Sequence, residues 1–243
     1  MSKTTTDRFL DCRLLIEQPT EGFRAGLDAV MLAAAVPAKP GERVLELGSG
    51  VGTAALCLAA TVMCSVTGVE IDRASVLLAR KNALANGLAE RARFVHGNAT
   101  TSPREIREEF AHVFSNPPFH DSDGSASPNM DRRRAMQDWA GLGAWITAGL
   151  RRTRSGGTFT MIIRADRLAV VLGRVLDNQV TIFPLWPRKE KSPKRVIVRI
   201  RKERGVGFTL LPGLSLHSKS GKYTREAEAV LRGRSRLDLS PRA

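Results

Sequence analysis

The motif Asn-Pro-Pro-Phe at positions 116–119 contains the side chains of this sequence best suited to chemistry. It follows the mostly apolar run at 111–115, so we expect it where a strand ends. Two consecutive prolines cannot donate ladder hydrogen bonds and restrict the backbone before them, which holds the amide and the ring close together. The amide oxygen and nearby carbonyls can accept both hydrogens of an exocyclic amine, and the ring can stack on a flat base. The motif therefore predicts methylation of a planar amino nitrogen.

A glycine-rich motif lies upstream, in the sequence Val-Leu-Glu-Leu-Gly-Ser-Gly-Val-Gly at 44–52. It begins as a buried strand and leads into an apolar segment of good helix formers. Glycines at such a junction let the backbone approach a ligand at the helix N-terminus. The next strand ends at Glu70, and an acid about twenty residues past the glycines is suited to a ribose diol. The spacing of Gly48, Gly50 and Gly52 differs from the dinucleotide pattern G-x-G-x-x-G and fits an adenosylmethionine-binding turn better. The alternative is a turn of this fold that binds no ligand.

Together these motifs resemble those of class I adenosylmethionine-dependent methyltransferases, in the branch with an N-P-P-[FY] motif. Four further segments look like the bacterial tRNA adenine-N6 methyltransferases, which modify the adenosine 3′ of the anticodon in a valine tRNA. These segments are 23–32, 164–168, 193–195 and 223–228. The resemblance implies an α/β, Rossmann-like fold with a mostly parallel seven-stranded sheet, helices on both faces and a C-terminal antiparallel hairpin.

The resemblance also implies roles for individual residues. Asn116 and the Pro117 carbonyl would accept the amine hydrogens, and Phe119 would stack on an extruded base. Asn98 stands where related enzymes commonly have aspartate, and its amide would bond the adenine amino group of S-adenosyl-L-methionine. Glu46 and the glycine turn would hold the methionine part of the cofactor, Glu70 the ribose, and Ile71 the adenine ring. The full set predicted to bind the cofactor is Glu46, Gly48, Gly50, Gly52, Glu70, Ile71, Asn98, Ala99 and Asn116.

Alternating strands and helices are expected to position these residues. An entry hairpin is expected at 7–19, and strands are expected at 43–47, 65–70, 92–95, 111–115, 158–163, 180–183 and 196–200. Helices are expected at 26–36, 53–60, 73–86, 103–109, 138–153, 167–177 and 223–231. This alternation implies a parallel sheet with ligands at the carboxyl ends of its strands. We expect an entry segment and helix at 1–40, a methyltransferase domain at 41–205, and a basic extension at 206–243 packed on that domain.

The charge of the sequence indicates a polyanionic partner. The 243 residues include 38 basic and 24 acidic side chains, which gives a formal net charge of +14. This favours RNA, above all tRNA, as the substrate. The alternative is that many arginines only solvate the surface. We interpret the polar region 121–138 as a substrate lid, the alternative being a surface loop without function. The predicted RNA contacts are Arg132, Arg133, Arg134, Lys194 and Arg195.

Cysteine and histidine usage and the hydropathy pattern argue against a disulfide-stabilised, metal-binding or membrane protein. Three cysteines without C-x-x-C spacing and four scattered histidines predict neither a disulfide framework nor a metal site. No signal peptide or membrane-length apolar run is present, so we expect a cytoplasmic protein with no membrane contact. The sequence implies no obligate protein partner. Release-factor glutamine methyltransferases share the N-P-P motif but carry a longer helical domain before the glycine turn, where this sequence has only about forty residues. A guanine-N2 rRNA methyltransferase and an RNA-binding module without catalysis are two further hypotheses.

Overall fold

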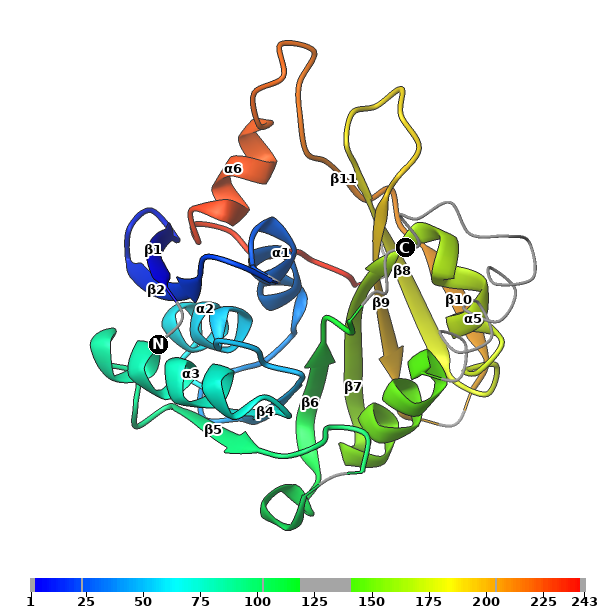
Figure 1. Ribbon diagram of the computed structural model, residues 1–243. Helices are drawn as coiled ribbons and strands as arrows, with labels where there is room; N and C mark the ends of the chain where they lie inside the picture. The colour runs from blue at the N-terminus through cyan, green and yellow to red at the C-terminus, as the bar shows by residue number, and fades with distance from the viewer. Residues whose placement is uncertain (1–2, 23, 102, 119–140, 204, 241–243) are drawn as a thin grey trace, which may run out of the picture.

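A twisted sheet forms the centre of the protein, and helices cover both of its faces (Figure 1). The structure, a computed structural model, describes residues 3–22, 24–101, 103–118, 141–203 and 205–240. Within these residues the sheet has nine strands in the order β10-β8-β9-β7-β6-β3-β4-β5, with β11 also paired to β8. The strands are β3 (Arg43–Leu47), β4 (Ser65–Glu70), β5 (Ala92–His96), β6 (Phe110–Ser115), β7 (Thr153–Arg164), β8 (Gln179–Trp186), β9 (Arg195–Arg201), β10 (Gly207–Leu210) and β11 (Leu214–Ser215).

The sheet is parallel except for β9, which lies antiparallel between β7 and β8. The prediction of seven strands is wrong by two, because β10 and β11 both pair with β8 in parallel. The predicted antiparallel hairpin is present as β8 and β9, but these additional strands extend the sheet beyond it. Sequence patterns did not indicate β10 and β11 because they are only four and two residues long. Such short strands give no clear hydrophobic period.

Burial on both faces of the sheet explains why the sequences of the central strands are mostly apolar. Every residue of β6 is buried, and so is every residue of β3 except Arg43. Strands covered on both sides read as continuous apolar runs. Val44 and Leu45 point to opposite faces, into two separate apolar clusters. The first cluster includes residues of α1 (Leu27–Ala35), α2 (Thr53–Thr61) and α3 (Arg73–Ala85), and the second includes residues of the helical stretch 141–152 and α5 (Leu168–Leu172).

Helix α3 shows how local sequence sets the ends of an element. Its N-cap residue, Asp72, accepts a hydrogen bond from the backbone N–H of Ser75 at 2.8 Å. Gly87 follows the helix with a φ of +64°, and the N–H of Leu88 donates to the carbonyl of Ala83 at 2.8 Å. A left-handed residue with these bonds is the usual way to satisfy the last carbonyls of a helix.

Two predicted helices are much shorter in the structure, and the other described helix ends differ from the prediction by one or two residues. The segment predicted at 103–109 contains only a 3-10 turn, η1 (Arg104–Ile106). The helix predicted at 167–177 is a 3-10 turn, η2 (Ala165–Arg167), followed by α5, which ends before Gly173. The helix predicted to reach residue 153 ends at residue 152, because Thr153 already begins β7. Gly173, which follows α5, disfavours a longer helix there.

The predicted entry hairpin is confirmed and lies against the C-terminal segment. Its turn has three consecutive non-glycine residues with positive φ, namely Leu10, Asp11 and Cys12. Asp11 forms ion pairs with Arg232 at 2.8 Å and with Arg234 at 2.6 Å. These contacts hold an otherwise unfavourable turn in place. The hairpin consists of β1 (Thr4–Phe9) and β2 (Leu14–Pro19), and the C-terminal helix is α6 (Arg225–Leu231).

Candidate active site

The two motifs singled out in the sequence meet at the carboxyl ends of β3 and β6. These strands are direct neighbours, with Leu47 paired to Ser115. The Ser115 hydroxyl donates to the Leu47 carbonyl at 2.9 Å, which ties the two strand ends together. Gly48 and Asn116 are the next residues along their chains, so the glycine turn and the Asn-Pro-Pro motif begin side by side. Ligands of open α/β sheets bind at such strand ends.

The glycine turn has a backbone that other residues rarely adopt. Gly48, Gly50 and Gly52 have φ values of +71°, +52° and +86°. A Cβ at Gly48 would lie 2.6 Å from the ring of Trp145, and one at Gly52 would lie 2.6 Å from the ring of Phe94. A Cβ at Gly50 would meet nothing within 4 Å. The outer glycines therefore permit close packing beneath the turn, while Gly50 borders open space on which a ligand can lie.

A hydrogen bond anchors Glu70, the residue predicted to bind the ribose diol, to the glycine turn. Its two carboxylate oxygens accept backbone N–H groups, Oε2 from Gly50 at 2.8 Å and Oε1 from Asp72 at 2.9 Å. Each carboxylate oxygen can accept a second hydrogen bond. The carboxylate thus has a fixed position and spare acceptor capacity for a pair of hydroxyls.

Glu46 is a buried acid beneath the turn. It is 3% exposed, and its Oε2 accepts the N–H of Ala55 in the first turn of α2 at 3.0 Å. Burial raises the pKa of Glu46 well above its usual range, the bond from Ala55 partly offsets this, and the charge of Glu70 adds to it. A cationic group bound nearby would stabilise the charged carboxylate. The α-ammonium group of a methionine moiety is a cation of this kind.

Three buried polar atoms at this edge have no hydrogen-bond partner among the residues that the structure describes. They are Ser49 Oγ, Thr53 Oγ1 and Asn116 Oδ1. An unpaired buried polar atom costs about 1–3 kcal/mol, so unpaired atoms gathered at one place are expected to have a functional partner. Together with Glu46, Glu70 and the open face of Gly50, they fit a polar ligand such as S-adenosyl-L-methionine.

The residues predicted to contact adenine lie at the ends of β4 and β5. Ile71 is 63% exposed, as expected of a side chain that packs on a bound ring, whereas Ala99 is buried. Asn98 Oδ1 already accepts two hydrogen bonds from Thr100, one from its N–H and one from its hydroxyl. The adenine amino group is a donor and would need this same oxygen. The Asn98 NH₂ group, which donates, is better suited to a ring nitrogen of adenine.

The remaining predicted residues are the prolines of the Asn-Pro-Pro-Phe motif, its phenylalanine, and the basic residues predicted to contact RNA. Pro117 is buried and Pro118 is exposed. Phe119, Arg132, Arg133 and Arg134, with the predicted lid at 121–138, lie outside the described residues. Lys194 is exposed, and Arg195 forms an ion pair with Asp28 of α1 at 2.9 Å. Arg195 therefore contributes to the contact between β9 and α1 whatever else it binds.

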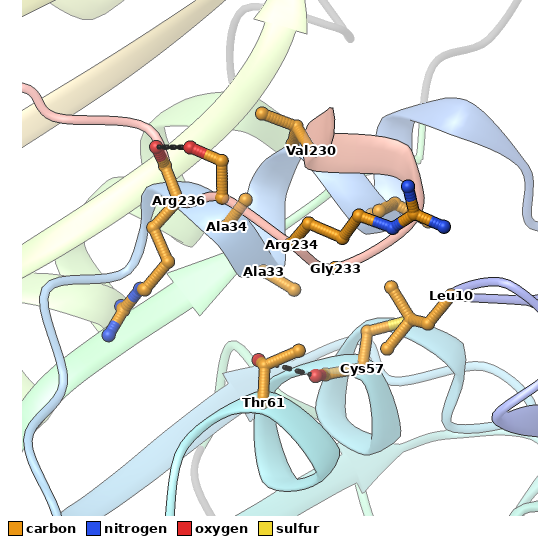
Figure 2. A pocket seen from close by; sticks show the side chains of 11 residues that line it. Leu10, Ala33, Ala34, Cys57, Thr61, Val230, Gly233, Arg234 and Arg236 are labelled. Atoms are coloured by element: carbon orange, nitrogen blue, oxygen red, sulfur yellow. Dashed lines mark hydrogen bonds between the residues drawn. The ribbon is translucent and has the colours of Figure 1, made fainter. Parts of the chain in front are cut away.

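Figure 2 shows a pocket that none of the predicted site residues lines. It lies between α1, α2, Leu10 and the segment 230–236. Cys57 on its wall is 1% exposed, and burial raises the pKa of its thiol. A buried thiol of this kind is unreactive. The pocket therefore has no reactive thiol.

Sequence patterns did not indicate the role of His112, which is buried near the start of β6. Its Nδ1 is 2.9 Å from the Thr158 hydroxyl, and its Nε2 is 3.1 Å from Glu42 Oε2. Burial lowers the pKa of His112, and the nearby Glu42 opposes this shift. His112 precedes the strand end that carries Asn116 and stabilises the fold.

Among the described residues, no group of three or more His, Cys, Asp or Glu side chains could hold a metal ion, and no helix is long and apolar enough to span a membrane.

The fold and this site together define a class I S-adenosyl-L-methionine-dependent methyltransferase. Residues 25–134 match the family model described as methyltransferase small domain. The chain is 30% identical to the tRNA1(Val) (adenine(37)-N6)-methyltransferase of Porphyromonas gingivalis over 208 residues, which cover 79% of this chain and 80% of that protein. It is also 30% identical to the enzyme of the same name from Shewanella amazonensis over 219 residues, covering 87% and 91%. The chain belongs to the tRNA1(Val) (adenine(37)-N6)-methyltransferase family.

A solved structure confirms the fold independently. A predicted O-methyltransferase from Agrobacterium tumefaciens superposes with a TM-score of 0.71 at 23% sequence identity. The match covers 86% of this chain and 98% of that one. The expectation of a Rossmann-like methyltransferase fold is therefore confirmed.

Proposed function

We propose that this enzyme methylates N6 of the adenosine at position 37 of a valine tRNA, next to the anticodon. The names of its relatives specify this reaction. The observation that carries the proposal is Asn116 Oδ1, a buried oxygen without a partner among the described residues, at the strand end beside the glycine turn. An acceptor in this position suits a substrate whose reacting group donates hydrogen bonds. The exocyclic amine of adenine is such a group.

Asn116 and Pro117 bind the amine through hydrogen bonds. The Asn116 side-chain oxygen and the Pro117 carbonyl accept hydrogen bonds from the two amine hydrogens. These bonds withdraw the nitrogen lone pair from conjugation with the ring and direct the lone pair toward the methyl group. S-adenosyl-L-methionine supplies a methyl group bonded to a positively charged sulfur. A methylated amine is strongly acidic and loses its extra proton to water, so the residues at the site need not include a strong base. Positioning and exclusion of water are therefore the main contributions of the protein.

The cofactor would be held by the groups at the ends of β3, β4 and β5. Glu46 would pair with the ammonium group of the methionine moiety, and Glu70 with the two ribose hydroxyls. Ile71 would cover one face of the adenine. The remaining contacts would come from the backbone of the glycine turn and from Asn98, Ala99 and Asn116.

The RNA would approach the same edge of the sheet. The target base must leave its stack to reach Asn116, and Phe119 is proposed to receive it. Lys194, Arg195 and the arginine triplet Arg132, Arg133 and Arg134 are proposed phosphate contacts, which the net charge of +14 supports. Because tRNA is a cytoplasmic molecule, we expect the protein in the cytoplasm.

The test is a methylation assay with defined RNAs. The purified chain and S-adenosyl-L-methionine are incubated with an unmodified valine tRNA transcript, the same tRNA with guanosine at position 37, a fragment of 16S rRNA, and a release factor. Mass spectrometry then identifies each product. We expect N6-methyladenosine at position 37 of the first RNA alone. Methylguanosine in rRNA or methylglutamine in the release factor would assign the enzyme to that substrate and contradict this proposal.

A further inference from the structure

Two loops project from the sheet at the same edge as the candidate active site. The first joins β8 to β9 at 187–194, and the second follows β11 at 216–224 (Figure 1, yellow and orange at the top). Because β8 and β11 run parallel to β6, Trp186 and Ser215 end at the edge where Asn116 lies. β6 and β8 are three strand spacings apart, roughly 14 Å at the usual separation. One RNA loop can span this distance.

Backbone hydrogen bonds join the two loops. The N–H of Leu216 donates to the Trp186 carbonyl at 2.7 Å, and that of His217 to the Pro187 carbonyl at 3.0 Å. The second loop then folds back on itself, with the N–H of Ser218 donating to Lys222 at 2.8 Å. These hydrogen bonds fix the two loops relative to each other, and we call them the paired loops.

The paired loops are strongly cationic. The first contains four basic residues and one acid, Glu190, and the second contains two lysines and no acid. All six basic side chains are exposed, and none of them has an ion-pair partner within the described residues. The six are Arg188, Lys189, Lys191, Lys194, Lys219 and Lys222.

An aromatic pair lies at the base of the second loop. Tyr223 and His217 face each other across a short antiparallel bridge, with ring centroids 4.7 Å apart and planes inclined by 22°. Tyr223 is the only tyrosine of the sequence and remains 44% exposed although His217 covers one face of its ring. Its surface toward solvent is thus a flat ring held in one orientation. A ring already fixed in place loses little entropy when a base stacks on it.

We propose that the paired loops bind the RNA substrate, with Tyr223 as a stacking platform for an unpaired nucleotide near the target adenosine. Cations that contact phosphates, combined with an exposed ring that stacks on bases, are how proteins hold single-stranded nucleic acid. An acidic protein would use the cations but would have no need for the oriented ring. This inference rests on the proposed function, because it assumes an RNA whose target base lies at Asn116.

The test compares Tyr223→Ala with Tyr223→Phe and with Phe208→Ala. Phe208 is a matched control because it is 48% exposed on β10 and pairs with Val180, near the opposite end of β8. Binding of the valine tRNA transcript is measured by fluorescence anisotropy, and methylation kinetics are measured with the same RNA. We expect Tyr223→Ala to weaken RNA binding and raise KM roughly tenfold, with kcat and cofactor affinity unchanged. Tyr223→Phe and Phe208→Ala should behave like the wild type.

Several results would overturn the inference. Wild-type RNA affinity in Tyr223→Ala would exclude the platform. Equal loss of RNA affinity, cofactor affinity and thermal stability in Tyr223→Ala would show that the residue only supports the fold. Competition by polyglutamate as strong as that by RNA of equal charge would indicate an acidic protein partner instead. Because binding is measured without turnover, an effect of Tyr223 on tRNA binding in an enzyme that forms no N6-methyladenosine would refute the proposed function and leave the paired loops as an RNA-binding surface.

Discussion

Substitution of Gly52 by alanine tests whether the glycine turn is shaped by the side chains packed beneath it. The φ of Gly52 is +86°, and the added Cβ would lie 2.6 Å from Phe94 Cζ and 3.2 Å from the Cβ of Ala79. The left-handed backbone costs about 1–2 kcal/mol for a residue with a Cβ, and overpacking costs about 1–3 kcal/mol more. We therefore expect Gly52→Ala to lower the free energy of unfolding by about 2–5 kcal/mol, measured by urea denaturation.

Two more glycines provide matched controls for this experiment. Gly50 and Gly87 have φ values of +52° and +64°, with nothing within 4 Å of an added Cβ. Alanine at either position should cost only the backbone part, about 1–2 kcal/mol. Gly50→Ala should also weaken cofactor binding, because Gly50 borders the open side of the turn, whereas Gly87→Ala should not. Phe94→Leu combined with Gly52→Ala should recover part of the lost stability. If Gly52→Ala destabilised the protein no more than Gly87→Ala, the contact with Phe94 would not constrain the turn.

Two further predictions concern buried titratable groups. Glu46 has a raised pKa in the folded state, so the folded protein holds more protons than the unfolded chain above about pH 4.5, and stability without cofactor should fall as pH rises from there. Glu46→Gln should flatten this dependence in urea denaturation and weaken cofactor binding roughly tenfold or more in calorimetry; unchanged cofactor affinity would exclude Glu46 from the site. His112 has a pKa below its ordinary value of 6.5, so the unfolded chain binds the extra proton and stability should fall as pH drops below about 6.5. His112→Asn should remove this loss, and an unchanged pH dependence in the variant would show that His112 does not cause it.

The sequence predicted the residues that shape the glycine turn and the strand end before Asn116. The glycine spacing and the acid twenty residues beyond it predicted that Glu70 holds the cofactor ribose. The structure places Glu70 against the turn, where its carboxylate accepts the N–H of Gly50. Asn116 was expected at a strand end because the apolar run before it stops at two prolines. These features are local, since each depends on residues close together in the chain or on a recurring strand-turn-helix unit.

What the sequence could not indicate depends on the conformation of individual turns and on the pairing of strands. Asn98 was expected to bind the adenine amino group, but its oxygen is already bonded to Thr100. Such a bond depends on the conformation of the turn after β5. The pairing of the second loop with Pro187 depends on the order of strands in the sheet. The stack of Tyr223 on His217 depends on how that loop folds back on itself. The short strands β10 and β11 escaped notice for a similar reason, because they are strands only by pairing with β8.

The role of Asn116 is tested most directly by the single-turnover rate of Asn116→Ala on the valine tRNA transcript, measured together with the affinity of the variant for S-adenosyl-L-methionine. If the Asn116 oxygen holds the reacting amine, the variant should methylate adenosine 37 at least roughly 100-fold more slowly. Its cofactor affinity should change much less, because Glu46, Glu70 and the glycine turn provide most of the proposed cofactor contacts. A methylation rate within a few-fold of the wild type would show that Asn116 does not hold the amine.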